Sequence, residues 1–223
     1  MPGRPRTLSQ TKILEAAAEV LPEDPSFASV SEQLGVSPQA LYKYFPNARS
    51  MQAHLAVRLL GDFADRQERG EAATDLEGFL VNYGLRYRDW LSETGYNPSI
   101  FAPSFDGQEF QTPEAMAILL RLLDTFIVAS ASFDVPKQQA VTLWIAIIDF
   151  LLNTSLLSLG NEEYLSFEQS LASEVDAEPE GFPHVAGYLD GAGDRTSQVQ
   201  NLFEFKLRAL SRGLAEQIAT ESP

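Results

Sequence analysis

The sequence contains no cysteine and only two histidines in 223 residues. The lack of cysteine excludes disulfide bonds, thiolate catalysis and cysteine-based zinc sites, and it suits a reducing compartment. The histidines, His54 and His184, do not have a metal-ligand spacing such as His-x-x-x-His, and there is no glycine-rich phosphate loop. We therefore predict a protein that is not an enzyme, with no catalytic residue, no metal site and no cofactor.

The sequence also does not suggest a hydrophobic run long enough to span a membrane. The most apolar stretch, residues 143–152, is ten residues long and contains Asp149, whereas a helix needs about 20 apolar residues to cross a bilayer. The first six residues are polar and do not resemble a secretory signal. These features predict a cytoplasmic protein without a membrane partner.

Positive charge is scarce, with 16 Lys and Arg against 31 Asp and Glu and a formal net charge of −15. This balance argues against binding nucleic acid over the whole surface, because phosphate binding needs positive charge. The charge is uneven, however: residues 1–60 hold six basic and five acidic residues, and the remainder holds ten and 26. The first 60 residues can therefore face DNA while the acidic remainder faces water.

Apolar residues recur at helical spacing, and no strand-type alternation or repeat appears, so we predict an all-α fold. The first helix is expected to begin at a capping-box pattern, Thr7 to Gln10, and to stop at Pro22. Later helices are expected over about 26–34, 38–45, 51–69, 76–91, 112–133, 136–159 and 196–219. A solvated acidic helix is expected within 162–180, with loops over 94–111 and 177–196.

Two domains are predicted from this pattern. Residues 1–50 form a three-helix, helix-turn-helix DNA-binding domain with a basic N-terminal arm. Residues 51–223 form a larger helical domain for effector binding and dimerisation.

The strongest motif lies in residues 27–44. A helix-turn-helix needs a small residue where its helices cross, a glycine in the turn and apolar residues on both inner faces. Ser31 is the small residue, and Gly35 follows four residues later. The apolar inner faces are supplied by Val30, Leu34, Val36, Leu41 and Tyr44.

Projection at about 100° per residue places Gln39 and Lys43 on the outward face of the third helix. Gln39 can hydrogen-bond base edges, and Ala40 can contact a thymine methyl group. Lys43 and the Tyr42 hydroxyl can reach phosphates, as can Ser26 and Ser37 at two helix N-termini. The alternatives are a solvated face for Gln39 and Lys43 and a purely structural role for Tyr42, Tyr44 and Phe45.

The N-terminal arm carries Arg4 and Arg6 directly before the first helix. Arginines are attracted to the negative potential of a minor groove. The arm is therefore a second candidate DNA contact, with a disordered tail as the alternative.

Three segments together resemble the N-terminal domain of TetR-type (tetracycline-repressor-like) transcriptional regulators: Ile-Leu-Glu-Ala-Ala at 13–17, Ser-Glu-Gln-Leu-Gly-Val-Ser at 31–37 and Leu-Tyr-Lys-Tyr-Phe-Pro at 41–46. The resemblance covers roughly residues 8–60. It implies a homodimer that binds a palindromic DNA operator and whose C-terminal domain responds to a small-molecule effector. By position, it implies DNA contacts from Ser26, Ser37, Gln39, Ala40, Tyr42 and Lys43.

The sequence departs from the family pattern at three places. The loop 22–25 is shorter than usual, and Ala28 stands where many relatives have a basic residue. Ala48 occupies the position of a frequent phosphate-binding lysine, although the adjacent Arg49 can substitute for it. We therefore expect weak or strongly salt-dependent DNA binding.

The helices 136–159 and 196–219 keep apolar stripes beyond what the core of one chain requires, so they predict a four-helix dimer interface. Packing within one chain is the alternative. The predicted interface residues are Ile148, Leu152, Ser155, Leu159, Phe203, Leu207, Leu210, Leu214 and Ile218.

An aromatic wall with few polar groups is typical of a small-molecule site, and an ordinary aromatic core is the alternative. The candidate effector-binding residues are Tyr83, Tyr87, Trp90, Met116, Leu120, Leu123, Phe126, Trp144, Asp149 and Asn153. Asp149 lies between apolar runs, where a carboxylate costs several kcal/mol unless it is paired or hydrated. We expect it to pair with Arg86 or Arg121, or to face a polar ligand.

These features predict a ligand-responsive regulator, most simply a repressor, in which an effector makes the helix 51–69 move the DNA-binding domain out of register with the major groove. One alternative is an all-helical enzyme that uses Glu162, Glu163 and Glu168 as a divalent-ion site, although a solvated acidic face is the simpler reading of these residues. Another is a helix-turn-helix that contacts protein and not DNA.

Overall fold

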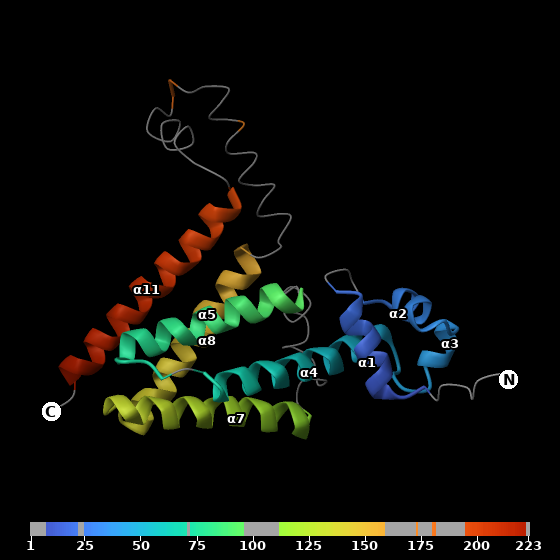
Figure 1. Cartoon of the computed structure of the whole chain (residues 1–223), viewed down its shortest axis with the longest axis horizontal. Coiled ribbons are helices and arrows are strands. Elements are labelled where there is room, and N and C mark those ends of the chain that lie inside the picture. The colour runs from blue at the N-terminus through green and yellow to red at the C-terminus, as the bar shows by residue number, and fades with distance from the viewer. Residues whose placement is uncertain are drawn as a thin grey trace. The chain divides into compact units, whose positions relative to one another are not determined.

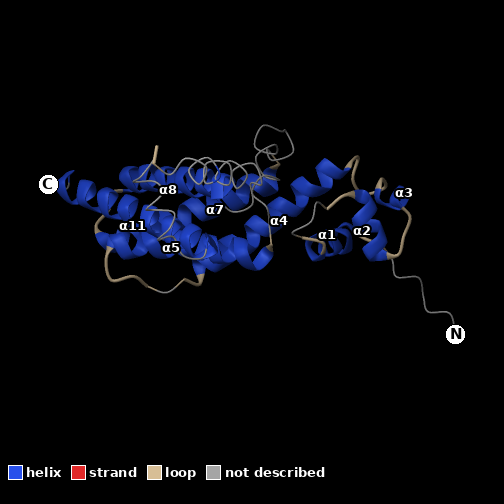
Figure 2. Ribbon diagram, turned by 90° about the horizontal axis from the view of Figure 1, so that it is seen from above, coloured by secondary structure: helices blue, strands red, loops and turns tan. Residues whose placement is uncertain are grey.

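The computed structural model describes residues 8–21, 25–70, 72–95, 112–158, 173, 180–181 and 195–221. Within these residues every regular element is a helix (Figure 2), which confirms the all-α prediction. Several predictions lie outside the described residues: those for Arg4, Arg6, Leu159 and the acidic helix with Glu162, Glu163 and Glu168.

The chain divides into two compact units. The first contains residues Met1–Gly70 and Arg86–Thr125, and the second contains Glu71–Leu85 and Phe126–Pro223. The domain boundary expected after residue 50 stays a prediction.

The first unit begins with α1 (Gln10–Glu19), α2 (Phe27–Leu34) and α3 (Pro38–Leu41), which we call the head. Helix α2 packs on both α1 and α3 (Figure 1). Ser9, and not Thr7, caps α1, because the Ser9 hydroxyl accepts a hydrogen bond from the Lys12 amide at 3.3 Å. The buried core of the head is formed by Ile13, Ala16, Ala17, Val30, Leu41 and Phe45.

Helix α4 (Ala48–Glu68) packs on α1 and begins three residues earlier than predicted. The reason is Asn47, whose side-chain oxygen accepts a 2.8 Å hydrogen bond from the Ser50 amide and so caps the helix. The first unit also contains the second part of α5 (Leu76–Thr94) and most of α7 (Pro113–Ser130).

The second unit contains the first part of α5, the short 3-10 helix η3 (Ala131–Phe133), α8 (Lys137–Ser158) and α11 (Arg195–Glu221). Helix α11 packs on α8, and the Phe150 and Phe203 rings lie 5.8 Å apart between them. Helix α11 also approaches α5 closely, since Cδ1 of Leu207 lies 2.6 Å from where a Cβ on Gly84 would stand. Glycine is therefore needed at residue 84 for this packing.

The segment Pro113–Phe133 has a mean hydropathy of 1.7 and is long and apolar enough to cross a membrane. Arg121 and Asp124 interrupt this segment, so the sequence alone does not single it out. Length and composition are weak evidence for a single helix, because helices of soluble proteins also pass this test.

Candidate functional site

The second helix of the head begins with a reciprocal cap. The Ser26 hydroxyl accepts a hydrogen bond from the Ser29 amide at 3.1 Å, and the Ser29 hydroxyl accepts one from the Ser26 amide at 3.0 Å. This capping box fixes the first turn of α2. Ser26 is predicted to contact phosphate, and its hydroxyl already serves the fold in this arrangement.

Gly35 ends α2 in the left-handed conformation, with φ 65°. The Val36 amide donates to the Ser31 carbonyl at 3.0 Å, and the Gly35 amide donates to the Glu32 carbonyl at 3.1 Å. This pair of bonds is a Schellman motif, which reverses the chain after a helix. Ser31 is buried at the crossing, so the residues that the motif assigned to crossing and turn occupy those places.

Helix α3 begins at Pro38 after Ser37, whose side chain makes no capping hydrogen bond. Gln39 and Lys43 are exposed, Ala40 is half-buried, and Leu41 is fully buried on the opposite side. Within the described part of the chain, neither the Gln39 amide nor the Lys43 ammonium has a hydrogen-bond or ion-pair partner. The expected separation into an inner and an outer face of α3 is therefore present.

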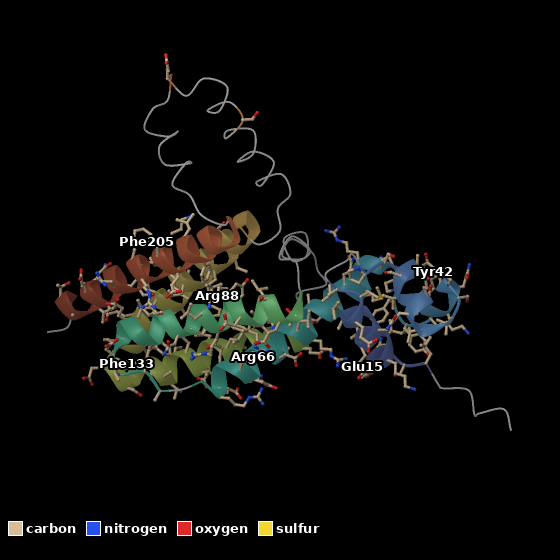
Figure 3. All side chains as sticks on the ribbon, turned by 45° about the horizontal axis from the view of Figure 1, so that its top comes forward. Glu15, Tyr42, Arg66, Arg88, Phe133 and Phe205 are labelled. Carbon is tan, nitrogen blue, oxygen red and sulfur yellow. The ribbon has the colours of Figure 1, made fainter. Side chains whose placement is uncertain are left out.

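Tyr42 lies on the outside of the head (Figure 3) and is 61% exposed. Its ring packs edge-on against Phe27, with centroids 4.8 Å apart. This contact joins the two helices of the motif and leaves most of the Tyr42 side chain in solvent. The sequence analysis read Phe27 only as an inward residue of α2, so its support of Tyr42 was missed.

Tyr44 and Phe45 face inward, in agreement with the alternative that their role is structural. Phe45 is 1% exposed and packs against the His54 ring of α4 at 5.3 Å. The Tyr44 hydroxyl donates to the Leu8 carbonyl, and the Gln10 side chain donates to the Tyr44 carbonyl. These contacts hold the turn after α3 against the start of α1.

Arg49 is exposed in the first turn of α4, on the surface that follows α3 in the chain. Among the described residues 8–50, the exposed cations are Lys12, Lys43 and Arg49, and the last two lie on either side of the turn between α3 and α4. This surface therefore combines the polar side chains of α3 with a small number of cations beside them.

The predicted effector-binding residues are divided between the two units. In the first unit, the Phe63 ring of α4 packs against Tyr87 and Trp90, at 5.5 and 5.2 Å between centroids. In the second unit, Tyr83 packs against Phe126 at 5.3 Å, and its hydroxyl accepts a 3.3 Å hydrogen bond from the Trp144 indole. These aromatic residues are buried except Trp144, which is half-buried, whereas Met116 and Leu120 are exposed and Leu123 is half-buried.

Asp149 is exposed and is not buried among apolar side chains. Asn153 is also exposed, and its side-chain amide donates a hydrogen bond to the backbone carbonyl of Asp149. The arginines considered as partners of Asp149 make other contacts: Arg86 donates to Gln67, and Arg121 contacts Asp65 and Glu68. The Asp149 carboxylate is therefore open to solvent, and the expected pairing with Arg86 or Arg121 is not found among the described residues. Its role in effector binding stays a prediction.

The outward faces of α8 and α11 also differ from the predicted interface. Phe203, Leu207 and Ile218 are buried within one chain, because they pack toward the other helices of the second unit. Phe205 is exposed instead (Figure 3). Leu202 of α11 and Ile145 of α8 are also exposed. Ile148, Leu152, Leu210 and Leu214 are half-buried, and the side chain of Ser155 lies outside the described residues.

No family model matches the chain, and no match to a curated protein was found. Solved structures do match over nearly the whole chain. A possible TetR family transcriptional regulator from Streptomyces coelicolor A3(2) has a TM-score of 0.68 and 19% identity, over 92% of this chain and 98% of that one. TetR from Acinetobacter baumannii AYE has a TM-score of 0.63 and 22% identity, over 95% of this chain and 98% of that one.

A variant of the A. baumannii TetR in complex with minocycline is also similar, with a TM-score of 0.59 and 21% identity over 95% of this chain and 99% of that one. At these identities the likeness concerns the fold. The sequence motif in the head and the match over the whole chain point to the same architecture. This chain therefore has the fold of the TetR-type transcriptional regulators.

Proposed function

We propose that this chain is a ligand-responsive transcriptional regulator, most simply a repressor, which binds a palindromic DNA operator as a homodimer. The observation that carries the proposal is the outward face of α3. Gln39 and Lys43 are exposed there on a helix whose other side is anchored by Leu41. Such a face can enter a major groove without disturbing the packing of the head.

The phosphate contacts come from few groups. Lys43 and Arg49 supply charge, while Ser37 and Tyr42 supply exposed hydroxyl groups. Because the chain as a whole carries a formal charge of −15, operator binding depends on this small region and is expected to be weak, with a salt dependence that grows with each phosphate neutralised.

Dimerisation is proposed through the exposed apolar residues of α8 and α11. Phe205 is 69% exposed and Leu202 is 44% exposed on α11, and Ile145 is 50% exposed on α8. A second copy of the chain would cover these side chains and place two heads on two half-sites. Light scattering tests this: Phe205→Ser should shift the mass from dimer toward monomer, whereas the matched change Lys206→Ser should not.

The protein is proposed to be cytoplasmic. Its effector is proposed to be a small organic molecule that contacts aromatic residues outside the head. The buried Tyr83, Phe126 and half-buried Trp144 supply aromatic surface with two polar atoms, the Tyr83 hydroxyl and the Trp144 indole nitrogen. The fold neighbour bound to minocycline supports an effector of this chemical class. Binding would release the operator by favouring a different position of the head.

Selection of bound duplexes from random DNA tests the function. The expected result is a sequence with two inverted half-sites, bound more tightly than random duplex at moderate salt. The selection is repeated with a panel of metabolites to find the effector that releases the DNA. If the purified protein prefers no sequence even at low ionic strength, the proposal fails.

A further inference from the structure

One face of α4 is held against α7 by a single arginine. Gly61, Asp65 and Glu68 are spaced by four and three residues, so they share this face of α4. Arg121 of α7 donates from Nη2 to the Gly61 carbonyl at 3.2 Å, and its Nε lies 3.2 Å from Glu68 Oε1. The same guanidinium also pairs with the Asp65 carboxylate. Arg121 therefore spans two turns of α4.

The two helices also approach closely at this point. Cδ1 of Ile118, three residues before Arg121, lies 3.6 Å from where a Cβ on Gly61 would stand. A Cβ there would be in ordinary van der Waals contact with the end of the Ile118 side chain, so the two helices pack against each other at this point. The small residue brings the Gly61 carbonyl within reach of the guanidinium, so packing and polar contacts act at one crossing.

The other side of the same α4 segment is held by α5. Arg66 pairs with Glu93, the Arg86 guanidinium donates to the Gln67 side chain at 2.9 Å, and the Phe63 ring packs on Tyr87. Residues 61–68 of α4 are therefore fixed from two directions within the first unit.

The N-terminal part of α4 is joined to the head. Arg58 donates to the Thr11 carbonyl of α1 at 3.4 Å and lies 3.7 Å from the Glu15 carboxylate. Helix α4 has 21 residues and contains no proline, so it runs for about 30 Å as one element. A displacement at residues 61–68 is consequently carried to α1.

We propose that Arg121 is a positioning residue for DNA binding: its clamp on α4 sets where the head is held. This rests on the proposed function and adds the residue through which α7 controls the head. Arg121 does not belong to the reading face, so it affects the spacing between two heads and not the contacts of one head. The planar guanidinium group is required for this role, because it contacts one carbonyl and two carboxylates at the same time.

The test compares two duplexes selected for binding to the unmodified protein: one with both half-sites and one in which the second half-site is scrambled. Arg121→Gln should lower the affinity for the complete site by about three- to tenfold and change the affinity for the single half-site by less than twofold. Arg69→Gln is the matched control, because Arg69 is exposed at the end of α4 and makes no ion pair with another described residue. It should leave both affinities unchanged.

The same loss should follow from removing the acidic partners in the double variant Asp65→Asn/Glu68→Gln, and combining it with Arg121→Gln should add little. This variant also keeps the test decisive if Arg121→Gln unfolds. Equal ratios of the two affinities in the unmodified protein and in the folded variants would overturn the inference while leaving the proposed function intact. Failure of the unmodified protein to bind either duplex selectively would instead overturn the proposed function, and the inference with it.

Discussion

The hydroxyl of Tyr44 donates a 2.7 Å hydrogen bond to the backbone carbonyl of Leu8. The two residues are 36 positions apart, and the bond ties the turn after α3 to the residue that precedes the cap of α1. The Gln10 side chain adds a second tie, to the carbonyl of Tyr44 itself, at 3.2 Å. A four-residue helix is too short to be stable alone, so such ties hold α3 in place.

Tyr44→Phe removes this tie and keeps the ring. We expect the free energy of unfolding to fall by about 1 kcal/mol, because the half-buried Leu8 carbonyl loses its partner. Urea denaturation measures the change. Tyr42→Phe is the control: its ring contact with Phe27 persists, so stability should stay the same while operator affinity falls. Equal stability losses in the two variants would contradict this role of Tyr44.

Gly35 is expected to be needed for its backbone conformation and not for space. A Cβ at residue 35 would have no neighbour within 4 Å among the described residues, whereas its φ is +65°. Gly35→Ala should therefore destabilise the head by about 1 kcal/mol, and Gly35→Asn should cost clearly less, because asparagine tolerates this conformation. Thermal unfolding followed by circular dichroism compares them. An alanine variant as stable as the asparagine variant would argue against strain.

Two buried serines should respond in opposite directions to alanine. Ser130 and Ser211 are both 0% exposed. The Ser130 hydroxyl donates to the Phe126 carbonyl at 2.7 Å, whereas the Ser211 hydroxyl has no hydrogen-bond partner among the described residues. Ser211→Ala should leave stability unchanged or raise it by up to about 1 kcal/mol, and Ser130→Ala should lower it. Calorimetry that shows a clear loss for Ser211→Ala would reveal a partner for that hydroxyl.

The residues proposed to face DNA should separate into two classes. Gln39→Ala should reduce the preference for the selected site over random duplex, because a contact to a base edge is lost. Lys43→Gln should weaken binding to both duplexes and reduce the slope of log affinity against log salt by about 1. Fluorescence anisotropy titrations at several salt concentrations measure both effects. An unchanged preference in Gln39→Ala would place this residue outside the groove.

The pair between Arg66 and Glu93 gives a titration signature. The hydrogen bond from Arg66, followed by its charge, lowers the pKa of the Glu93 carboxyl below its ordinary value. Since the folded pKa is the lower one, the stabilisation is present above the unfolded pKa and is lost as the pH falls through the folded pKa. Carboxyl NMR titration should show the Glu93 pKa returning to its ordinary value in Arg66→Gln, with Arg88→Gln as the control that leaves it low.

Much of the head could be predicted from the sequence because its signals are local. The serine cap of α2, the left-handed glycine and the alternation of faces on α3 each depend on residues within a few positions of one another. The start of α1 was the exception, because Thr7 and Ser9 are both acceptable caps and Ser9 serves in the fold.

The helices outside the head were harder to predict because they are apolar on several sides. On α8, Ile147 is fully buried while the nearby Ile145 is half exposed and Asp149 is in solvent. On α11, Phe203 faces inward and Phe205 outward. When apolar residues lie on every side of a helix, the sequence alone does not predict which side packs against the rest of the chain. The long-range contacts of Arg121 were likewise invisible, because they join residues 56 positions apart.

The division of α3 into an anchored side and a solvent side has a consequence for how this protein could change. Leu41 anchors α3 in the core and Pro38 begins the helix. Gln39, Ala40 and Lys43 are therefore not needed for either of these structural roles. Gln39 and Lys43 are exposed and can accept other side chains at little cost to folding. Under the proposed function, recognition of a different DNA sequence is therefore open to this scaffold through point substitutions, by natural drift or by engineering.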